Sequence, residues 1–504
     1  MKLVFNIASL FLKQAKNHPE RLALIAVNKQ ITYRELEKEV KQTVQYFHSK
    51  GIRSGDRVLV FIPMGFDLYR VVLALFSMGA VAVFLDEWVS FSRLAVCCKM
   101  ARCKAFISLW YLHIPGWFSQ EVREIPIHLF SGKPTVTPDT EFSLFEAHPD
   151  DPALITFTTG STGIPKAANR THGFLMAQFE SLKPLIDNDL QIDMPMLPIV
   201  LLLNLAVGKT SVIAKFKSSK PKQFRSEFVL NQLGLNKVQS LTASPWFLVQ
   251  MARETIRSGR KFPHLKQILS GGGPVFPHEA TLVNEAFPQS EFTVVFGSTE
   301  AEPISHISGI DMRKAMSQMN DPMRGLLVGK PDSSIECLII PIQEEAVTQI
   351  NPLPPGESGE LIVSGNHVLD SYIDNPEATR MNKIKAEGKV WHRTGDAAYF
   401  SDDGMLWLLG RCQGRIRFKE RNFYPFQIEY SLMNLTPPVI GTLLDLESGP
   451  VLVVEKKSTQ FQQEEMLVKL GLAEIPRIEV SQFPMDKRHH TKIDYSSLKE
   501  LVSK

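Results

Sequence analysis

The chain has 504 residues, of which 44% are hydrophobic and 22% are charged. It can bury a large core and is too long for one domain of ordinary size, so two or more domains are expected. The 56 basic and 53 acidic residues leave a formal charge of only +3, without a long basic tract, so nucleic acid is not an expected partner.

The N-terminal segment contains a short apolar stretch that Asn6, Ser9 and Lys13 interrupt, so no signal peptide is predicted. The longest apolar run, residues 71–85, is shorter than the roughly 18 to 20 residues of a membrane span. The five cysteines have no paired spacing typical of a zinc site. We therefore expect a cytoplasmic protein without an integral membrane segment, whose thiols are buried and reduced.

The first part of the chain predicts alternating helices and strands. Thr32 and Glu35 fit a capping box ahead of apolar residues at helical spacing, and Gly51 is expected to end that helix. The run "DRVLVFI" (residues 56–62) predicts a buried strand, and helix and strand alternate again through residues 68–85. This alternation is typical of a parallel α/β sheet.

Three apolar runs end in segments rich in glycine and hydroxyl groups. These segments begin near Thr158, Gly271 and Gly297. Ligands of an open parallel sheet sit at the carboxyl ends of its strands, so the three loops can converge on one pocket. The segment "TTGSTGIPK" (residues 158–166) offers N–H groups, hydroxyls and Lys166 to an anion, although its spacing is not that of a Walker loop. Alone, it fits either a phosphate-binding loop or an ordinary surface loop.

From about Cys337 the pattern changes to short strands and turns, with a hairpin predicted at "SDDG" (residues 401–404). The last part of the chain has strands of its own and a final short helix. We expect an N-terminal domain at residues 1–410 and a C-terminal domain at residues 411–504, with the boundary near Gly410 to Gly414.

Several short motifs occur in a fixed order between about residues 5 and 500: "TTGSTGIPK", "SGGGP", "FGSTE", "GELIVSG", "WHRTGD", "LLGR" and "TKID". Together they resemble the adenylate-forming superfamily, which includes acyl-CoA synthetases, luciferases and nonribosomal adenylation domains. The resemblance implies an α/β fold: a large N-terminal domain of layered mixed and parallel sheets with helices and a small β-strand subdomain, and a small, mobile α+β C-terminal domain. It also implies an enzyme that uses ATP and Mg²⁺ to convert a carboxylic acid into an acyl-adenylate, with release of pyrophosphate. In such an enzyme residues 1–410 would bind ATP and the acyl group, and residues 411–504 would form a lid domain with a hinge near residues 411–414.

The resemblance implies a role for each motif residue in binding the nucleotide. The residues implied to hold the β- and γ-phosphates of ATP are Thr158, Thr159, Gly160, Ser161, Thr162, Gly163 and Lys166. Gly272, Gly273 and Pro274 would line the adenine, because missing side chains let a flat ring approach the backbone. Asp396 would accept both ribose hydroxyls, a role that suits a carboxylate, and Arg411 would also reach the ribose.

The same resemblance implies catalytic roles for Glu300, Thr299 and Lys492. Glu300 matches the family's magnesium-associated glutamate and is the expected metal ligand, while Thr299 would lie beside the α-phosphate. Lys492 matches the lysine of the mobile domain, whose ammonium offsets the repulsion between the attacking carboxylate and the anionic phosphate. Taken singly, Asp396 fits a turn cap, Glu300 a solvated charge and Lys492 a surface lysine. His172, His489 and His490 receive no role.

The hinge departs from the family pattern. Gly414 stands where many ligases have Asp or Lys, and Glu420 stands where a glycine usually lines the pantetheine channel. A glutamate would crowd and charge a narrow tunnel, which argues against coenzyme A as the acceptor. The segments "FGSTEAEPIS" and "MDKRHHTKID" resemble the branch that contains the β-lactone synthetases of bacterial olefin biosynthesis. Those enzymes adenylate a 3-hydroxy fatty acid, whose own hydroxyl then closes a four-membered lactone ring.

Two apolar segments, residues 196–208 and 242–252, fall where the family builds its acyl pocket. They lack a charge that would pair with an amino-acid ammonium, so a fatty or 3-hydroxy fatty acid is favoured, although ordinary core segments would look the same. The acceptor stays open between an internal hydroxyl, a carrier-protein thiol, coenzyme A and an amine. A non-catalytic nucleotide-binding or acyl-binding relative is a further hypothesis, against which the complete motif set argues.

Overall fold

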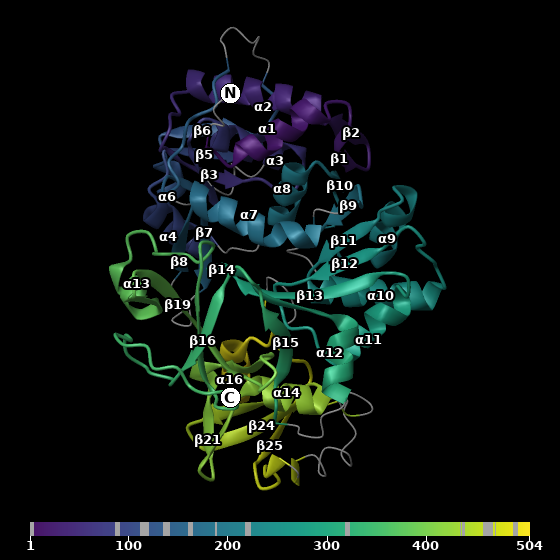
Figure 1. Cartoon of the computed structure of the whole chain (residues 1–504), viewed down its shortest axis with the longest axis vertical. Coiled ribbons are helices and arrows are strands. Elements are labelled where there is room, and N and C mark those ends of the chain that lie inside the picture. The colour runs from purple at the N-terminus through teal and green to yellow at the C-terminus, as the bar shows by residue number, and fades with distance from the viewer. Residues whose placement is uncertain are drawn as a thin grey trace.

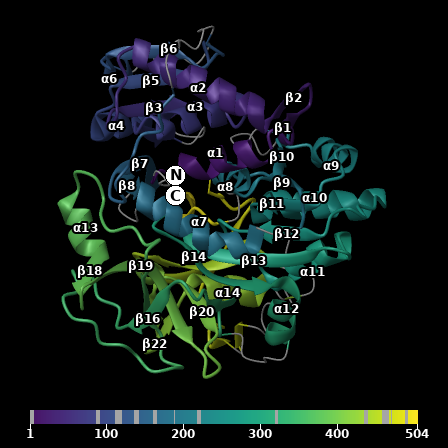
Figure 2. The same ribbon diagram turned by 45° about the horizontal axis from the view of Figure 1, so that its top comes forward.

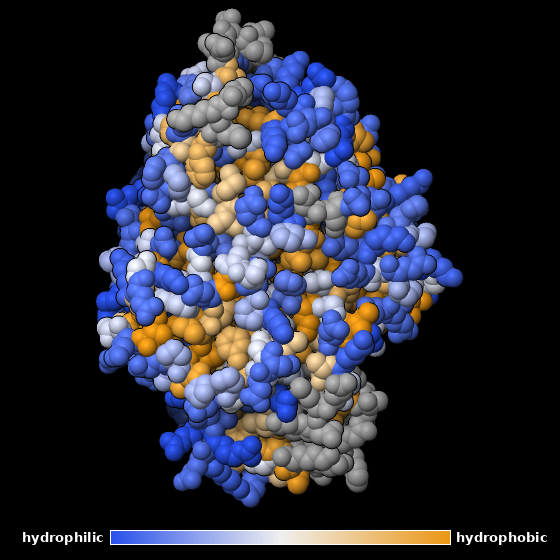
Figure 3. Space-filling view, viewed as in Figure 1, coloured by the Kyte–Doolittle hydropathy of each residue, from blue (hydrophilic) through white to orange (hydrophobic). Residues whose placement is uncertain are grey.

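The structure is a computed structural model. The residues that it describes are 5–85, 91–110, 120–134, 142–159, 165–186, 189–216, 223–317, 323–433, 435, 439–456, 467–468, 470–486 and 492–503. Figure 1 shows the purple and blue N-terminal part at one end of the long axis and the yellow C-terminal elements toward the other. Figure 3 shows a face covered mainly by hydrophilic residues, with smaller hydrophobic areas between them. No helix in the described ranges is both long and apolar enough to cross a bilayer.

The first sheet confirms the parallel α/β pattern expected for the N-terminal part. Its described strands are, in spatial order, β6 (Ile127–Phe130), β5 (Ala105–Ser108), β3 (Arg57–Phe61), β4 (Val81–Phe84), β7 (Pro152–Thr159) and β8 (Pro165–Thr171). Neighbours from β6 to β7 are parallel, and β7 and β8 form an antiparallel pair. The helices of this part are α1 (Ala8–Asn17), α2 (Tyr33–Ser49), α3 (Phe66–Ser77), α4 (Phe91–Ala101), α6 (Gln120–Arg123) and α7 (His172–Ile186).

The capping box at the start of α2 is formed as predicted. The Thr32 amide donates to Glu35 Oε2 at 2.8 Å, and the Glu35 amide donates to Thr32 Oγ1 at 3.2 Å. Gly51, just beyond the helix, has a φ of 85°, a left-handed conformation that glycine adopts without strain.

The second sheet is larger and joins a parallel half to an antiparallel half. Its described strands are, in spatial order, β16 (Glu336–Ile340), β17 (Gly359–Ser364), β19 (Lys389–Phe400), β20 (Leu406–Arg411), β15 (Leu326–Pro331), β14 (Ala301–Ser308), β13 (Glu291–Ser298), β12 (Gln267–Ser270), β11 (Ser240–Ala243), β9 (Ile192–Pro195), β10 (Thr210–Val212), β1 (Leu22–Ala26) and β2 (Lys29–Thr32), while β18 (Lys383–Ala386) pairs with β19. Strands from β1 to β13 in this order are parallel, and those from β13 to β16 are antiparallel. The predicted hairpin between β19 and β20 is confirmed.

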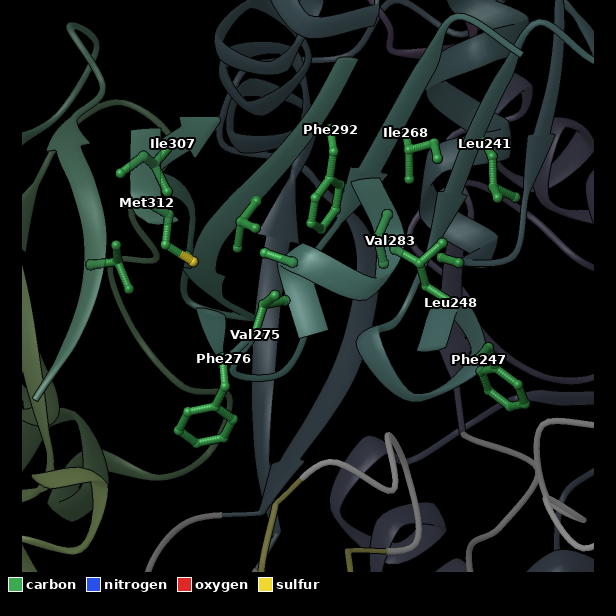
Figure 4. Packing of buried hydrophobic residues seen from close by; sticks show 14 of the residues in the cluster. Leu241, Phe247, Leu248, Ile268, Val275, Phe276, Val283, Phe292, Ile307 and Met312 are labelled. Atoms are coloured by element: carbon green, nitrogen blue, oxygen red, sulfur yellow. The ribbon is translucent and has the colours of Figure 1, made fainter. Parts of the chain in front are cut away.

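Helices pack against the parallel half and bury its apolar side chains. They are α8 (Pro198–Val207), α9 (Ser226–Leu235), α10 (Pro245–Ser258), α11 (Pro277–Ala286) and α12 (Gly309–Ser317), and α13 (Pro376–Asn382) precedes β18. Figure 4 shows Leu241, Ile268 and Phe292 on neighbouring strands, with Leu248 of α10 and Val283 of α11 beside them. Each such side chain contributes roughly 1.5–3 kcal/mol when it leaves water.

The C-terminal part has sheets of its own, as expected. Its elements are η2 (Cys412–Gly414), β21 (Ile416–Phe418), β22 (Arg421–Phe423), α14 (Pro425–Met433), β23 (Gly441–Leu446), β24 (Gly449–Glu455), β25 (Arg477–Val480) and α16 (Tyr495–Val502). β21 and β22 form a hairpin, and β23, β24 and β25 form a separate sheet. The Gln427 side chain of α14 donates to the Met323 carbonyl at 2.5 Å, which joins this part to the preceding one.

Helix α7 lies between the two large sheets. It contacts β8 of the first sheet and β14 of the second, and both views show it in this position (Figures 1 and 2). β8 follows the expected phosphate loop, and β14 follows the "FGSTE" turn, so two of the motifs adjoin strands that contact this helix.

Candidate active site

The β7–β8 hairpin carries the expected phosphate loop. Thr158 lies opposite Lys166 in its register. The partly buried Lys166 ammonium lies 5.4 Å from the centre of the Tyr372 ring. Burial lowers the pKa of Lys166, and the nearby Glu300 acts against that shift. Of the residues expected to hold phosphate, Gly160, Ser161, Thr162 and Gly163 lie outside the described residues. For Thr158 and Thr159 the backbone is described but the side chains are not.

Glu300 lies in the tight turn between β13 and β14. The Tyr372 hydroxyl donates to Glu300 Oε1 at 2.9 Å. Burial acts to raise the pKa of Glu300, but nearby His392 and Lys383 and the Tyr372 hydroxyl outweigh it, so the pKa lies below its ordinary value. Burial also lowers the pKa of Lys383 to about 7 and that of His392 to about 3. The site therefore holds an ionised carboxylate among buried basic side chains.

The segment 368–373 ties the two sheets together at this point. Tyr372 forms a bridge with Ala168 of β8, and Val368 forms one with Ala301 of β14. The Leu369 amide also donates to the Glu300 carbonyl at 2.7 Å. The strand after the phosphate loop and the turn that carries Glu300 are thus held side by side by backbone contacts.

Thr299 is joined to the same strand by an arginine. Arg170 of β8 donates from Nη2 to the Thr299 carbonyl at 2.9 Å. Its guanidinium also lies 5.5 Å from the centre of the Phe174 ring. Arg170 therefore fixes the backbone of the "FGSTE" turn relative to the phosphate hairpin.

Asp396 and Arg411 form an ion pair across β19 and β20. The two residues are opposite in the register, and Arg411 Nη1 lies 2.8 Å from Asp396 Oδ1. Arg411 also donates to the Thr394 carbonyl at 3.1 Å. Asp396 raises the pKa of Arg411, and the positive charge of Arg411 contributes to lowering the pKa of Lys166.

The segment Gly271–Pro274 follows the carboxyl end of β12. A Cβ on Gly271 would lie 3.0 Å from the Val295 carbonyl oxygen of the neighbouring strand, and Gly272 has a φ of 84°. Gly273 and Pro274 are partly exposed. Glycine is needed here because the chain turns close to β13, which leaves an open backbone surface at the edge of the sheet.

The family model described as AMP-binding enzyme matches residues 11–373, which is more than half of the chain. The chain belongs to the AMP-binding enzyme family. An olefin beta-lactone synthetase from Stenotrophomonas maltophilia is 26% identical to this AMP-binding enzyme, over 98% of the chain and 97% of the relative. These similarities identify an adenylate-forming ligase.

Solved structures share the fold of this AMP-binding enzyme. The amide bond synthetase McbA from Marinactinospora thermotolerans superposes with a TM-score of 0.82, at 19% identity over 98% of this chain and 99% of that one. The O-succinylbenzoate coenzyme A synthetase of Bacillus subtilis, in complex with ATP and magnesium ion, superposes with a TM-score of 0.78, at 21% identity over 97% of this chain and 99% of that one. The expected fold class, with its small C-terminal α+β part, is confirmed.

The donor set of the AMP-binding enzyme suits magnesium held jointly with a nucleotide. In the described ranges, no three His, Cys, Asp or Glu side chains form a cage for a metal ion. Mg²⁺ binds through one or two carboxylates together with substrate phosphates, and the ionised Glu300 close to Lys166 meets that requirement.

The segment at residues 410–414, where the sequence predicts a hinge, lies close to Pro425. A Cβ on Gly410 would lie 2.9 Å from Pro425 Cδ, and one on Gly414 would lie 3.2 Å from Pro425 Cγ. Lys419 and Glu420 form the two-residue turn between β21 and β22, with φ values of 48° and 62°. Glu420 thus occupies a left-handed position that favours glycine, and its side chain is exposed.

Lys492 lies in a short loop before α16. Its amide donates to Asp486 Oδ1 at 2.9 Å, the Asp486 amide donates back to the Lys492 carbonyl, and Met485 and Ile493 form a bridge. The exposed Lys492 side chain is thereby carried on a defined backbone. Residues 487–491 of this loop, with His489 and His490, lie outside the described residues.

The expected acyl segments belong to the core around the parallel half of the sheet. In α8, Leu201 and Leu205 are fully buried, and Asn204 donates to Asp193 Oδ2 at 2.6 Å. At the start of α10, Trp246 and Phe247 pack edge to face at 5.0 Å. These contacts agree with the alternative that the two segments are ordinary core segments. They do not exclude an acyl pocket formed by the same apolar side chains.

Three residues that sequence reasoning missed complete the site: Arg170, Tyr372 and Lys383. Each acts through tertiary contacts, with the Thr299 carbonyl, the Glu300 carboxylate and the Leu369 carbonyl respectively. None belongs to a motif with a recognisable spacing, although Tyr372 and Ile373 directly precede the polar segment "DNPEAT".

Proposed function

We propose that the enzyme activates a fatty or 3-hydroxy fatty acid as its acyl-adenylate, with ATP as the second substrate and pyrophosphate as the product. The main support is that Lys166 and Glu300, from distant segments, both lie against Tyr372, and that Asp396 and Arg411 form an ion pair whose arginine interacts electrostatically with Glu300. Enzymes of this family use ATP and Mg²⁺. We also propose a cytoplasmic setting, because none of the five cysteines, all within the described ranges, forms a disulfide.

In this proposal the nucleotide lies along the edge where the strands end. Lys166 and the loop at residues 158–163 would hold the β- and γ-phosphates, and Thr299 would lie by the α-phosphate. Asp396 and Arg411 would hold the ribose, and residues 272–274 would line the adenine. The positive charge of Lys166 suits the phosphates, and the carboxylate of Asp396 suits the hydroxyl groups of the ribose.

The reaction is an in-line displacement. An oxygen of the substrate carboxylate forms a bond to the α-phosphorus, and the bond from that phosphorus to the pyrophosphate oxygen breaks. Lys492, carried by the C-terminal domain, would offset the negative charge between the two reactants. Glu300 would hold Mg²⁺, which when bound neutralises phosphate charge.

We further propose two domains, residues 1–410 and 411–504, with rotation about residues 411–414. The separate sheets of the C-terminal part and the short helix η2 at this junction support that division. Rotation would bring Lys492 to the phosphates for the first step and withdraw it for the second.

For the second step we favour closure of a 3-hydroxy acid to its β-lactone, in which the hydroxyl oxygen attacks the carbonyl carbon and AMP leaves. The similarity to an olefin beta-lactone synthetase over nearly the whole chain supports this acceptor. A charged Glu420, at a position where glycine would leave a channel open, is a reason against coenzyme A. A carrier-protein thiol, coenzyme A and an amine are the competing acceptors.

Pyrophosphate release with ATP, Mg²⁺ and a panel of fatty and 3-hydroxy fatty acids tests the first step. We expect at least one acid to stimulate pyrophosphate release. A folded Lys166→Ala variant should lose this stimulation. No stimulation by any acid would leave the non-catalytic alternative. Mass spectrometry with and without coenzyme A tests the acceptor: a 3-hydroxy acid should lose water without coenzyme A, and a thioester product would contradict lactone closure.

A further inference from the structure

Lys383 occupies an unusual position for a lysine. It begins β18 and is only 6% exposed, although lysine is rarely buried unless it is paired. Its ammonium donates to the Leu369 carbonyl and lies 5.6 Å from the centre of the Tyr372 ring. Withdrawing an ammonium from water costs free energy that nearby carboxylates and hydrogen bonds must offset. A specific set of partners must therefore favour this position.

Those partners converge on Glu300. Leu369, which accepts from Lys383, donates its own amide to the Glu300 carbonyl at 2.7 Å. Tyr372, whose ring lies beside the Lys383 ammonium, donates its hydroxyl to Glu300 Oε1 at 2.9 Å. Glu300 and Asp370 are the carboxylates that attract Lys383. Lys383 is therefore connected to Glu300 through the backbone, through an aromatic ring and through charge.

We propose that Lys383 is a positioning residue for Glu300: it holds the Leu369 carbonyl and lies beside the Tyr372 ring, and so fixes the segment whose Tyr372 hydroxyl holds the Glu300 carboxylate where Mg²⁺ and the ATP phosphates meet. The inference rests on the proposed function, in which Glu300 carries the metal. Lys383 acts through its neighbours, by fixing the segment 368–373 from which the Leu369 amide and the Tyr372 hydroxyl reach Glu300.

Equilibrium binding of a non-reactive ATP analogue with a methylene group between its α- and β-phosphorus tests this role, measured by calorimetry as a function of Mg²⁺ concentration. Lys383→Met should need about tenfold more Mg²⁺ for half-maximal analogue binding, the effect expected when the hydrogen bond that fixes the Leu369 segment is lost and Glu300 is no longer held in place. Tyr372→Phe, which keeps the ring, should shift in the same direction by less, and Lys383→Arg should restore part of the loss. Binding of AMP, measured without metal, should stay unchanged in these variants.

Lys209 provides the matched control. It is also buried, at 3% exposure, but it lies beside Asp193 rather than Glu300. Lys209→Met should lower thermal stability without changing the Mg²⁺ dependence. An equal Mg²⁺ shift in Lys209→Met, or an equal loss of AMP binding in Lys383→Met, would mean that Lys383 acts only through overall stability and would overturn the inference.

Glu300→Gln separates this inference from the proposed function. If Glu300→Gln raises the Mg²⁺ requirement and Lys383→Met does not, the positioning role is wrong and the metal assignment stands. If Glu300→Gln leaves the requirement unchanged, the metal assignment is wrong and the positioning role with it. Tighter Mg²⁺ binding in Lys383→Met would mean that the ammonium competes with the metal, which also contradicts the inference. Should Lys383→Met not fold, Tyr372→Phe decides, and a wild-type Mg²⁺ dependence in that variant overturns the proposal.

Discussion

Replacing Asp396 by asparagine perturbs the proposed ribose site with little change in shape. The Asp396 side chain is 15% exposed, and its carboxylate forms an ion pair with Arg411 at 2.8 Å. A carboxylate accepts with both oxygens, whereas an amide keeps one acceptor. Loss of one hydrogen bond to a charged acceptor is worth about 1.5–3 kcal/mol, so ATP should bind roughly 10- to 100-fold more weakly. Because Arg411 is 56% exposed, the same change should alter folding stability by less than about 1 kcal/mol.

Calorimetric titration with ATP, 2′-deoxy-ATP and 3′-deoxy-ATP measures this interaction as a double-mutant cycle. The unmodified enzyme should bind both deoxynucleotides more weakly than ATP. In the Asp396→Asn variant, at least one of the two deoxynucleotides should bind almost as tightly as ATP. The missing ribose hydroxyl then costs little, because the carboxylate that accepts from it is already gone. Two results would refute the assignment of Asp396 to the ribose. One is equal ATP affinity in the variant and the unmodified enzyme; the other is that the losses of binding free energy from Asp396→Asn and from removal of the hydroxyl are additive.

Three further changes probe other parts of the molecule. Lys492→Ala should slow acyl-adenylate formation by about 100-fold or more while ATP affinity changes little, and an equal loss of ATP affinity would make the lysine a binding residue. Burial raises the pKa of Glu429 to about 7, so the folded protein keeps a proton on Glu429 that the unfolded chain loses near the ordinary glutamate pKa of 4.5. Stability should therefore fall by up to about 3 kcal/mol between pH 4.5 and 7, and Glu429→Gln should remove much of that fall in urea unfolding; an unchanged pH profile would contradict the burial argument. Arg393→Met should cost about 3–5 kcal/mol because it leaves buried Glu360 without its partner at 2.6 Å, and a second change to Glu360→Met should recover stability; no recovery would show that packing by Arg393 matters more than its charge.

Local patterns predicted the individual elements of this fold better than their assembly. The capping box at Thr32 and Glu35 and the alternating helices and strands depend on near neighbours, which the sequence displays directly. The order of strands depends on distant pairing: β1, at Leu22–Ala26, pairs with β10, at Thr210–Val212. Nothing in either short strand specifies its partner, because pairing follows from how whole layers bury their apolar faces.

The site was predictable where a residue belongs to a motif and not where its role arises from packing. Lys383 and Lys385 alternate along "KIKA" and should share a face of β18, yet Lys383 is buried and Lys385 is exposed. The difference comes from the segment 368–373, which covers one end of the strand. Tyr372 likewise gains its role only because β8 and β14, from different sheets, meet at this segment.

The fate of oxygen-18 from the substrate carboxylate tests the formation of an acyl-adenylate most directly. A 3-hydroxy fatty acid labelled in both carboxylate oxygens is incubated with ATP, Mg²⁺ and the enzyme, and the nucleotide and phosphate products are analysed by mass spectrometry. One labelled oxygen should appear in AMP and none in pyrophosphate, because the carboxylate attacks the α-phosphorus and AMP later leaves with that oxygen. Label in inorganic phosphate together with ADP, or unlabelled AMP alongside a converted acid, would contradict the proposed chemistry.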